Sequence, residues 1–172
     1  YLAHEKKKIF FNKWTAIGVG SSIPRAGDAK PYNLLGIPLI LIRDKNMDVR
    51  VFHNVCSHRG FKLLDKACKL KNVIRCPYHS WAYDFNGQLV ATPHIGGLNN
   101  HQSTNFNKTK SNLKEVKTKL WMDIIFVNIN SNELDFDQYI KPLEERWSKF
   151  INKDDQKLIV KSDDYGLSLI HI

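Results

Sequence analysis

Two short segments of this chain each combine one cysteine with one histidine, and they constrain its fold more than any other feature. One residue separates Cys56 from His58, and two residues separate Cys76 from His79. Only residues 59–75 lie between the two segments. Thiolate and imidazole groups are common ligands of zinc and of iron–sulfur centres. The sequence therefore predicts a metal centre held by Cys56, His58, Cys76 and His79.

The order of these four ligands favours an iron–sulfur cluster over zinc. Zinc fingers usually take both cysteines from one loop and both histidines from the next, whereas each loop here is mixed. In a cluster of two irons and two sulfides, the two cysteines can bind one iron and the two histidines the other. A zinc-binding interaction module stays open as an alternative.

The residues around the ligands resemble a known family. Cys-Ser-His-Arg-Gly at 56–60 and Cys-Pro-Tyr-His-Ser-Trp-Ala-Tyr-Asp at 76–84 are similar to the Rieske motif of aromatic-ring-hydroxylating, non-haem iron oxygenases, in the N-terminal part of the large (alpha) subunit. Ser80 departs from the glycine usual in that family. Respiratory Rieske proteins have an extra cysteine in each loop and a serine that donates to a sulfide, where this chain has Phe61, Tyr78 and Trp81. The resemblance implies a Rieske 2Fe–2S cluster of low potential, about −150 mV.

The hydrophobic pattern predicts a mainly β chain between two amphipathic helices. Apolar residues follow helical spacing over 4–13 and over 135–151, the second helix being kinked or restarted at Pro142. Residues 92–111 lack periodicity and predict a long surface loop. Asn86-Gly87 predicts a tight hairpin. Strands are expected at 14–19, 36–43, 49–55, 73–76, 80–85, 88–91, 113–117, 120–130 and 157–161.

The resemblance assigns these elements to a Rieske iron–sulfur fold, with small antiparallel sheets or a sandwich carrying two cluster-binding loops. We expect both loops at the tip of one antiparallel unit, because each follows or separates predicted strands. The expected division is a helical lead-in at 1–13, the Rieske domain at 14–131, a helix and linker at 132–156, and the start of a truncated catalytic domain at 157–172.

Composition narrows the possible partners and compartments. The net charge is +9, but the lysines fall into separate groups without a recognisable nucleic-acid module, so no nucleic-acid partner is expected. No apolar run reaches the roughly 20 residues of a membrane span, and no signal peptide is visible. If Cys56 and Cys76 bind metal, Cys68 has no partner for a disulfide. These features predict a cytoplasmic protein without a membrane partner.

The resemblance implies an oxidoreductase, a Rieske mono- or dioxygenase. In that family a ferredoxin or flavin reductase reduces the cluster, which passes electrons to a mononuclear Fe(II) that activates O2, and the large subunits form a homotrimer or a trimer with a small subunit. That iron needs two histidines and a carboxylate. After His101 this sequence has only His171, so we expect no catalytic residue here and a catalytic iron outside this chain. A free-standing Rieske ferredoxin, an electron carrier without catalysis, is the alternative.

The sequence also suggests roles for residues other than the four ligands. Trp81 and Tyr83 are expected to pack against the cluster and tune it. Four further residues are expected to have no ligand role, namely His53, Cys68, His94 and His101. A basic surface is a candidate docking site for an acidic electron donor, with Arg59, Lys62, Lys66, Lys69 and Lys71 as its members.

Overall fold

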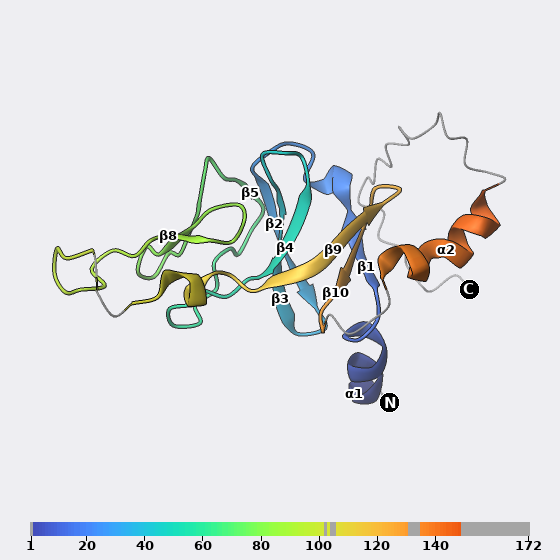
Figure 1. Cartoon of the computed structure of the whole chain (residues 1–172), viewed down its shortest axis with the longest axis horizontal. Helices are drawn as coiled ribbons and strands as arrows, with labels where there is room; N and C mark the ends of the chain where they lie inside the picture. Colours follow the sequence, from blue (N-terminus) through green and yellow to red (C-terminus); the bar gives the residue numbers. More distant parts are fainter. Residues whose placement is uncertain (1, 102, 104–105, 131–134, 149–172) are drawn as a thin grey trace.

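The structure is a computed structural model that describes residues 2–101, 103, 106–130 and 135–148. Within these residues the chain is mainly β and forms two antiparallel sheets, as expected for a Rieske fold. The larger sheet has seven strands in the order β1-β10-β9-β4-β3-β2-β5 (Figure 1). Their bounds are Thr15–Val19 for β1, Ile124–Asn128 for β10, Glu115–Trp121 for β9, Val49–His53 for β4, Ile37–Arg43 for β3, Asp28–Leu34 for β2 and Cys68–Lys69 for β5.

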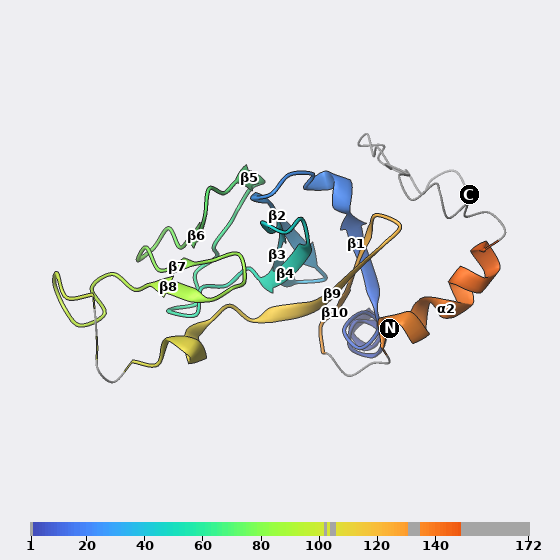
Figure 2. The ribbon, with the colours of Figure 1, turned by 45° about the horizontal axis from the view of Figure 1, so that its top comes forward.

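The smaller sheet has three short strands in the order β6-β7-β8. They span Ile74–Arg75, Ala82–Tyr83 and Leu89–Ala91. Figure 2 shows these strands together at one end of the molecule, on the opposite side of the large sheet from α2. The small sheet therefore forms a separate layer against the large one.

Central strands of the large sheet are apolar on both faces, which explains the dense apolar run of β3. Alternate residues of a strand point to opposite faces. Ile40 and Ile42 belong to a core shared with the small sheet, which also contains Phe52. Leu39 and Leu41 belong to a second core on the other face. The large sheet thus serves as the base on which the small sheet packs.

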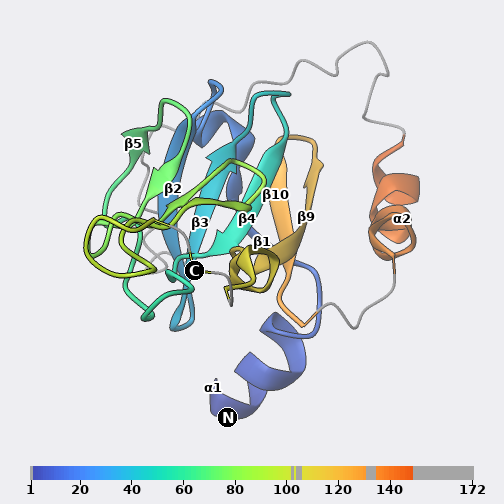
Figure 3. The same ribbon diagram turned by 60° about the vertical axis from the view of Figure 1, so that its left-hand side comes forward.

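Helices α1 and α2 lie away from the small sheet. The N-terminal helix α1 (Leu2–Glu5) continues as a π-helical segment, Lys6–Phe10, which agrees with the predicted leading helix. Helix α2 (Phe136–Trp147) contains Pro142 within a single element and stands beside β9 and β10 (Figure 3). A third apolar cluster joins Trp14, Phe136 and Ile140, and Trp14 is buried there. Short 3-10 turns occupy Gly20–Ser22 and Lys108–Ser111.

Three expectations about the strands were wrong. The turn expected between the strands at 113–117 and 120–130 lies later in the chain, since β9 runs without a break to Trp121. Met122 and Asp123 both adopt positive φ (48° and 63°) and form the tight turn between β9 and β10. Strands β2 and β5 were not predicted, since their sequences are only weakly apolar. The two ligand loops do not belong to one antiparallel unit: the first follows β4 of the large sheet, and the second joins β6 to β7 of the small sheet.

One expected strand and the end of one expected helix fall outside the described residues. The predicted strand at 157–161 lies outside them, as does the end of the predicted helix beyond residue 148. No helix in the described part of the chain has the length and apolar character needed to cross a membrane.

Candidate metal centre

The first ligand loop is closed by two backbone hydrogen bonds around Cys56. The Cys56 N–H donates to the Phe61 carbonyl at 2.8 Å, and the Gly60 N–H donates to the Cys56 carbonyl at 2.9 Å. Gly60 adopts φ +70°, a conformation that glycine reaches without steric cost. The loop therefore turns back on itself directly after β4 and leaves His58 at its outer bend.

The second ligand loop has the same hydrogen-bond pattern around Cys76. Its N–H donates to the Trp81 carbonyl at 2.8 Å, and the Ser80 N–H donates to the Cys76 carbonyl at 3.0 Å. Ser80 adopts φ +59°, at the position that Gly60 occupies in the first loop. The two loops are thus near copies in backbone terms, although their histidines stand two and three residues after the cysteine.

These loops bring the four predicted ligands together as two pairs. Cys56 and Cys76 are each 2% exposed, and Cys76 lies close enough to perturb the ionisation of Cys56. His58 and His79 are half-buried at the outer side, and their ring centroids are 4.8 Å apart. The arrangement therefore has a buried thiol side and a partly exposed imidazole side.

The ionisation of these groups fits a cationic cluster. Burial is the largest effect on the Cys56 thiol and raises its pKa, and the adjacent Cys76 raises it further against opposing hydrogen bonds from Tyr83 and the His58 backbone. A positive metal is needed to hold two adjacent thiolates there. Burial also lowers the pKa of His58, and the charges of His79 and Arg59 add to this, which favours the neutral ligand form.

One buried atom points to the same conclusion. Nδ1 of His58 is buried and has no hydrogen-bond partner among the described residues. A buried nitrogen without a partner is costly, and ligation of a metal would satisfy it.

Aromatic rings enclose the imidazole side. Trp81 is 5% exposed and stacks on the His58 ring, with centroids 4.5 Å apart and planes 9° apart. The Tyr78 ring lies against the His79 ring, with centroids 3.8 Å apart, and Tyr78 is 54% exposed. Phe61 completes this surface, with its centroid 5.3 Å from that of Tyr78. These contacts fix the histidine rings and leave one edge of the site open to solvent.

Tyr83 joins the small sheet to the first ligand loop. Its hydroxyl lies 3.2 Å from the Cys56 sulfur and accepts the Ser57 backbone N–H at 3.1 Å. Burial, followed by the contact with Cys56, raises the pKa of Tyr83, so the hydroxyl keeps its proton. Because its oxygen already accepts from Ser57, the hydroxyl proton is available to the sulfur.

The remaining candidate residues lie apart from this arrangement. Cys68 is on β5 at the edge of the large sheet, and it is a free thiol, as are Cys56 and Cys76. His53 ends β4; burial and then the charge of Lys114 lower its pKa. His94 and His101 are exposed, with rings 5.0 Å apart, and each Nδ1 accepts a backbone N–H. Their surface position agrees with the sequence prediction.

Comparison with known proteins identifies the family. The model of the Rieske [2Fe-2S] domain matches residues 13–102. The chain is 33% identical over 129 residues to the carnitine monooxygenase oxygenase subunit of Escherichia coli (strain K12), covering 75% of this chain and 33% of that protein. It is 31% identical over 137 residues to the 2-aminobenzenesulfonate 2,3-dioxygenase subunit alpha of Alcaligenes sp, covering 79% of this chain and 34% of that protein.

A solved structure agrees in fold. The apo form of the quaternary ammonium Rieske monooxygenase CntA superposes with a TM-score of 0.75 at 30% identity, covering 86% of this chain and 41% of that one. Another structure of a quaternary ammonium Rieske monooxygenase is described in terms of carnitine oxidation and inter-subunit electron transfer. The chain spans about a third of the length of the curated relatives named above.

The chain belongs to the Rieske [2Fe-2S] domain family. The cofactor of that family is a 2Fe–2S cluster, and the paired thiols and imidazoles of this chain fit it. The similarity to the N-terminal part of oxygenase alpha subunits agrees with the resemblance carried by the sequence motif.

Replacing Ser80 with glycine should stabilise the protein. A residue with a Cβ at φ +59° is strained, so Ser80→Gly should raise the free energy of unfolding by about 1 kcal/mol. The matched change, Gly60→Ser, should lower it by a similar amount, because no atom lies within 4 Å of a Cβ built there and only the φ of +70° opposes it. Thermal unfolding of both variants checks this. A destabilised Ser80→Gly protein would show that the serine hydroxyl matters more than the strain.

Removing the Tyr83 hydroxyl should lower the reduction potential of the cluster. A donor to the cysteine sulfur stabilises the more negative reduced state, so Tyr83→Phe should shift the reduction equilibrium about tenfold, or about 60 mV downward. Tyr78→Phe is the control, because it removes the hydroxyl of an exposed tyrosine beside His79. A redox titration in which both variants keep the parent potential would exclude Tyr83 as a donor.

Proposed function

We propose that Cys56, Cys76, His58 and His79 hold the 2Fe–2S cluster, with the cysteines on the buried iron and the histidines on the outer iron. The observation that carries this proposal is the pair of matching ligand loops, with both thiols buried and both imidazoles at the partly exposed side. When bound, such a cluster carries one electron at a time. Four protein ligands leave no open position on it, so this domain transfers electrons and has no catalytic residue of its own.

The whole protein is proposed to be a Rieske non-haem iron oxygenase, an oxidoreductase that uses O2. Electrons from a ferredoxin or flavin reductase would enter here and continue to a mononuclear iron held outside the described residues. Support comes from the relatives, which are oxygenase subunits, and from the extent of the similarity. An oligomer, a homotrimer or a trimer with a small subunit, is proposed as well, since a related monooxygenase is described by inter-subunit electron transfer.

The alternative, a free-standing Rieske ferredoxin, would need only the cluster domain. The similarity to an oxygenase subunit extends over 129 residues, beyond the family match at 13–102. Helix α2 also packs on Trp14 through Phe136 and Ile140, so it is built into the fold. Both observations favour the oxygenase. On this basis we keep the division into 1–13, 14–131, 132–156 and 157–172 as a proposal.

Within this proposal the side chains of the chain have separate tasks. His58 and His79 would bind metal and form the partly exposed edge, which is the shortest route for an electron to a partner. Trp81 holds His58 in place by stacking. Tyr83 donates toward the Cys56 sulfur. The domain thus keeps water and partners away from the thiol side while presenting the imidazole side.

Serine substitutions test the ligand assignment. Cys56→Ser and Cys76→Ser should abolish the red-brown colour and the EPR signal of the reduced cluster, because a serine hydroxyl is a poor substitute for thiolate. Cys68→Ser should keep both, since Cys68 lies on β5. Visible absorption, iron content and EPR of the three purified variants provide the measurement. A colourless Cys68→Ser protein would overturn the assignment.

The basic surface should speed docking of an acidic electron donor. Its five residues are exposed, although Lys62 pairs with Asp65 and Lys69 with Asp28. Lys66→Gln with Lys71→Gln should slow reduction about threefold at low ionic strength. The difference should disappear as salt reduces the screening length to about 10 Å at 0.1 M.

The control for this prediction is Lys141→Gln with Arg146→Gln, an equal loss of two positive charges on α2. Stopped-flow reduction by an acidic ferredoxin is the measurement. A reduction rate independent of salt and equal in all variants would show that these lysines only solvate the surface.

A further inference from the structure

The turn between β7 and β8, residues 84–88, is fastened to the large sheet. The Asp84 carboxylate accepts the backbone N–H groups of Asn86 at 2.9 Å and Gln88 at 2.8 Å, which makes the turn rigid. Gly87 rests on Phe52 of β4: a Cβ at Gly87 would lie 2.5 Å from the Phe52 ring. The Gly87 carbonyl accepts the Leu113 N–H at 2.8 Å.

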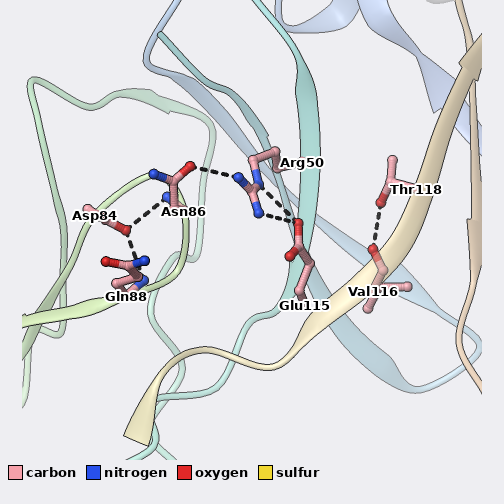
Figure 4. A network of polar contacts seen from close by, with 7 residues as sticks. All are labelled: Arg50, Asp84, Asn86, Gln88, Glu115, Val116 and Thr118. Carbon is pink, nitrogen blue, oxygen red and sulfur yellow. Dashed lines mark hydrogen bonds and ion pairs between the residues drawn. The ribbon is translucent and has the colours of Figure 1, made fainter. Parts of the chain in front are cut away.

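Arg50 of β4 reaches across from the large sheet to the same turn (Figure 4). Its Nη1 donates to the Asn86 Oδ1 at 2.6 Å, and its Nε and Nη2 donate to the Glu115 Oε1 at 2.9 and 2.7 Å. The guanidinium carbon lies 5.6 Å from the centroid of the Phe52 ring. Arg50 therefore joins β4, β9 and the β7–β8 turn through one side chain.

This junction lies next to Tyr83 in the chain. Tyr83 is the last residue of β7, a strand of only two residues, and Asp84 opens the turn. Such a short strand has few ladder hydrogen bonds to hold it. The position of Tyr83 relative to Cys56 must therefore depend on what anchors the small sheet to the large one.

We propose that Arg50 and Asn86 are positioning residues that set the contact between the Tyr83 hydroxyl and the Cys56 sulfur, and through it the reduction potential of the cluster. The inference rests on the proposed function, since it requires the cluster to be bound at Cys56. It extends that function to a link that touches neither the cluster nor its ligands. The two ligand loops come from different sheets, so a contact between the sheets sets their relative position.

Stability alone does not account for this link. The side chains of Arg50 and Glu115 are 26% and 48% exposed, and ion pairs with this exposure contribute little to stability. Loss of the Arg50 contact to Asn86 should therefore leave global unfolding almost unchanged. It should, however, loosen the turn that follows Tyr83 and weaken the donation to sulfur.

Asn86→Ala is the sharpest variant, because it removes the acceptor of Arg50 without changing any charge and keeps the backbone bonds of the turn. We expect about a threefold shift of the reduction equilibrium toward the oxidised state, about 28 mV for one electron. Arg50→Lys keeps the charge but loses the planar guanidinium that bonds to Asn86 and Glu115 together, and it should shift the potential in the same direction. In a Tyr83→Phe background, Asn86→Ala should cause no further shift, because both changes act through one hydrogen bond.

Asn130→Ala is the matched control. It removes an exposed hydrogen bond of the same length, 2.6 Å from Asn130 Nδ2 to Asn12 Oδ1, outside the contacts of the two ligand loops, and should leave the potential unchanged. Redox titration of the cluster-loaded chain and thermal unfolding of each variant are the measurements. An unchanged potential in Asn86→Ala and Arg50→Lys, or a full shift that persists in the Tyr83→Phe background, would overturn the inference. If the parent chain binds no iron, the proposed function fails and the inference with it.

Discussion

Two thiols buried side by side are the constraint on which the rest of this structure depends. Cys56 and Cys76 are each 2% exposed, and burial together with their proximity raises the pKa of Cys56. A pair of thiolates is stable there only if a strongly positive centre neutralises it. The imidazoles need no such neutralisation, because histidine binds metal in its neutral form and can also face solvent. With the proposed cluster bound, the charge would be compensated on the buried thiol side, and electrons would be exchanged at the partly exposed edge formed by His58 and His79.

The second requirement is that two sheets keep the ligand pairs facing each other. The first loop follows β4 and the second joins β6 to β7, so each sheet supplies one thiol and one imidazole. A shared apolar core containing Phe52 and Tyr83 holds the layers together. Two directional contacts add to it: Tyr83 to Cys56 at one end of β7, and Arg50 to Asn86 across the following turn. Apolar packing thus supplies stability, and polar contacts supply the geometry that a cluster needs.

Local chemistry made the site and the class of fold predictable from the sequence, while contacts between distant segments were not. Each ligand loop, and the hairpin at Asn86-Gly87, is specified by residues that lie within a few positions of one another. By contrast, β5 pairs with β2 across about 40 residues of chain, and nothing local marks it as a strand. The turn at Met122 and Asp123 was misplaced because neither residue is glycine. Nothing in the sequence marks Arg50, because its partners Asn86 and Glu115 lie 36 and 65 residues away.

The most direct test of the account is pulsed EPR of the dithionite-reduced chain, which detects nitrogen nuclei bonded to the paramagnetic iron. The account predicts two strongly coupled nitrogens, one lost in His58→Cys and the other in His79→Cys, because both imidazoles bind the outer iron of one 2Fe–2S cluster. It also predicts two irons per chain. A reduced cluster without coupled nitrogens, or a colourless protein with one zinc per chain, would contradict the central claim that these two loops build a Rieske centre.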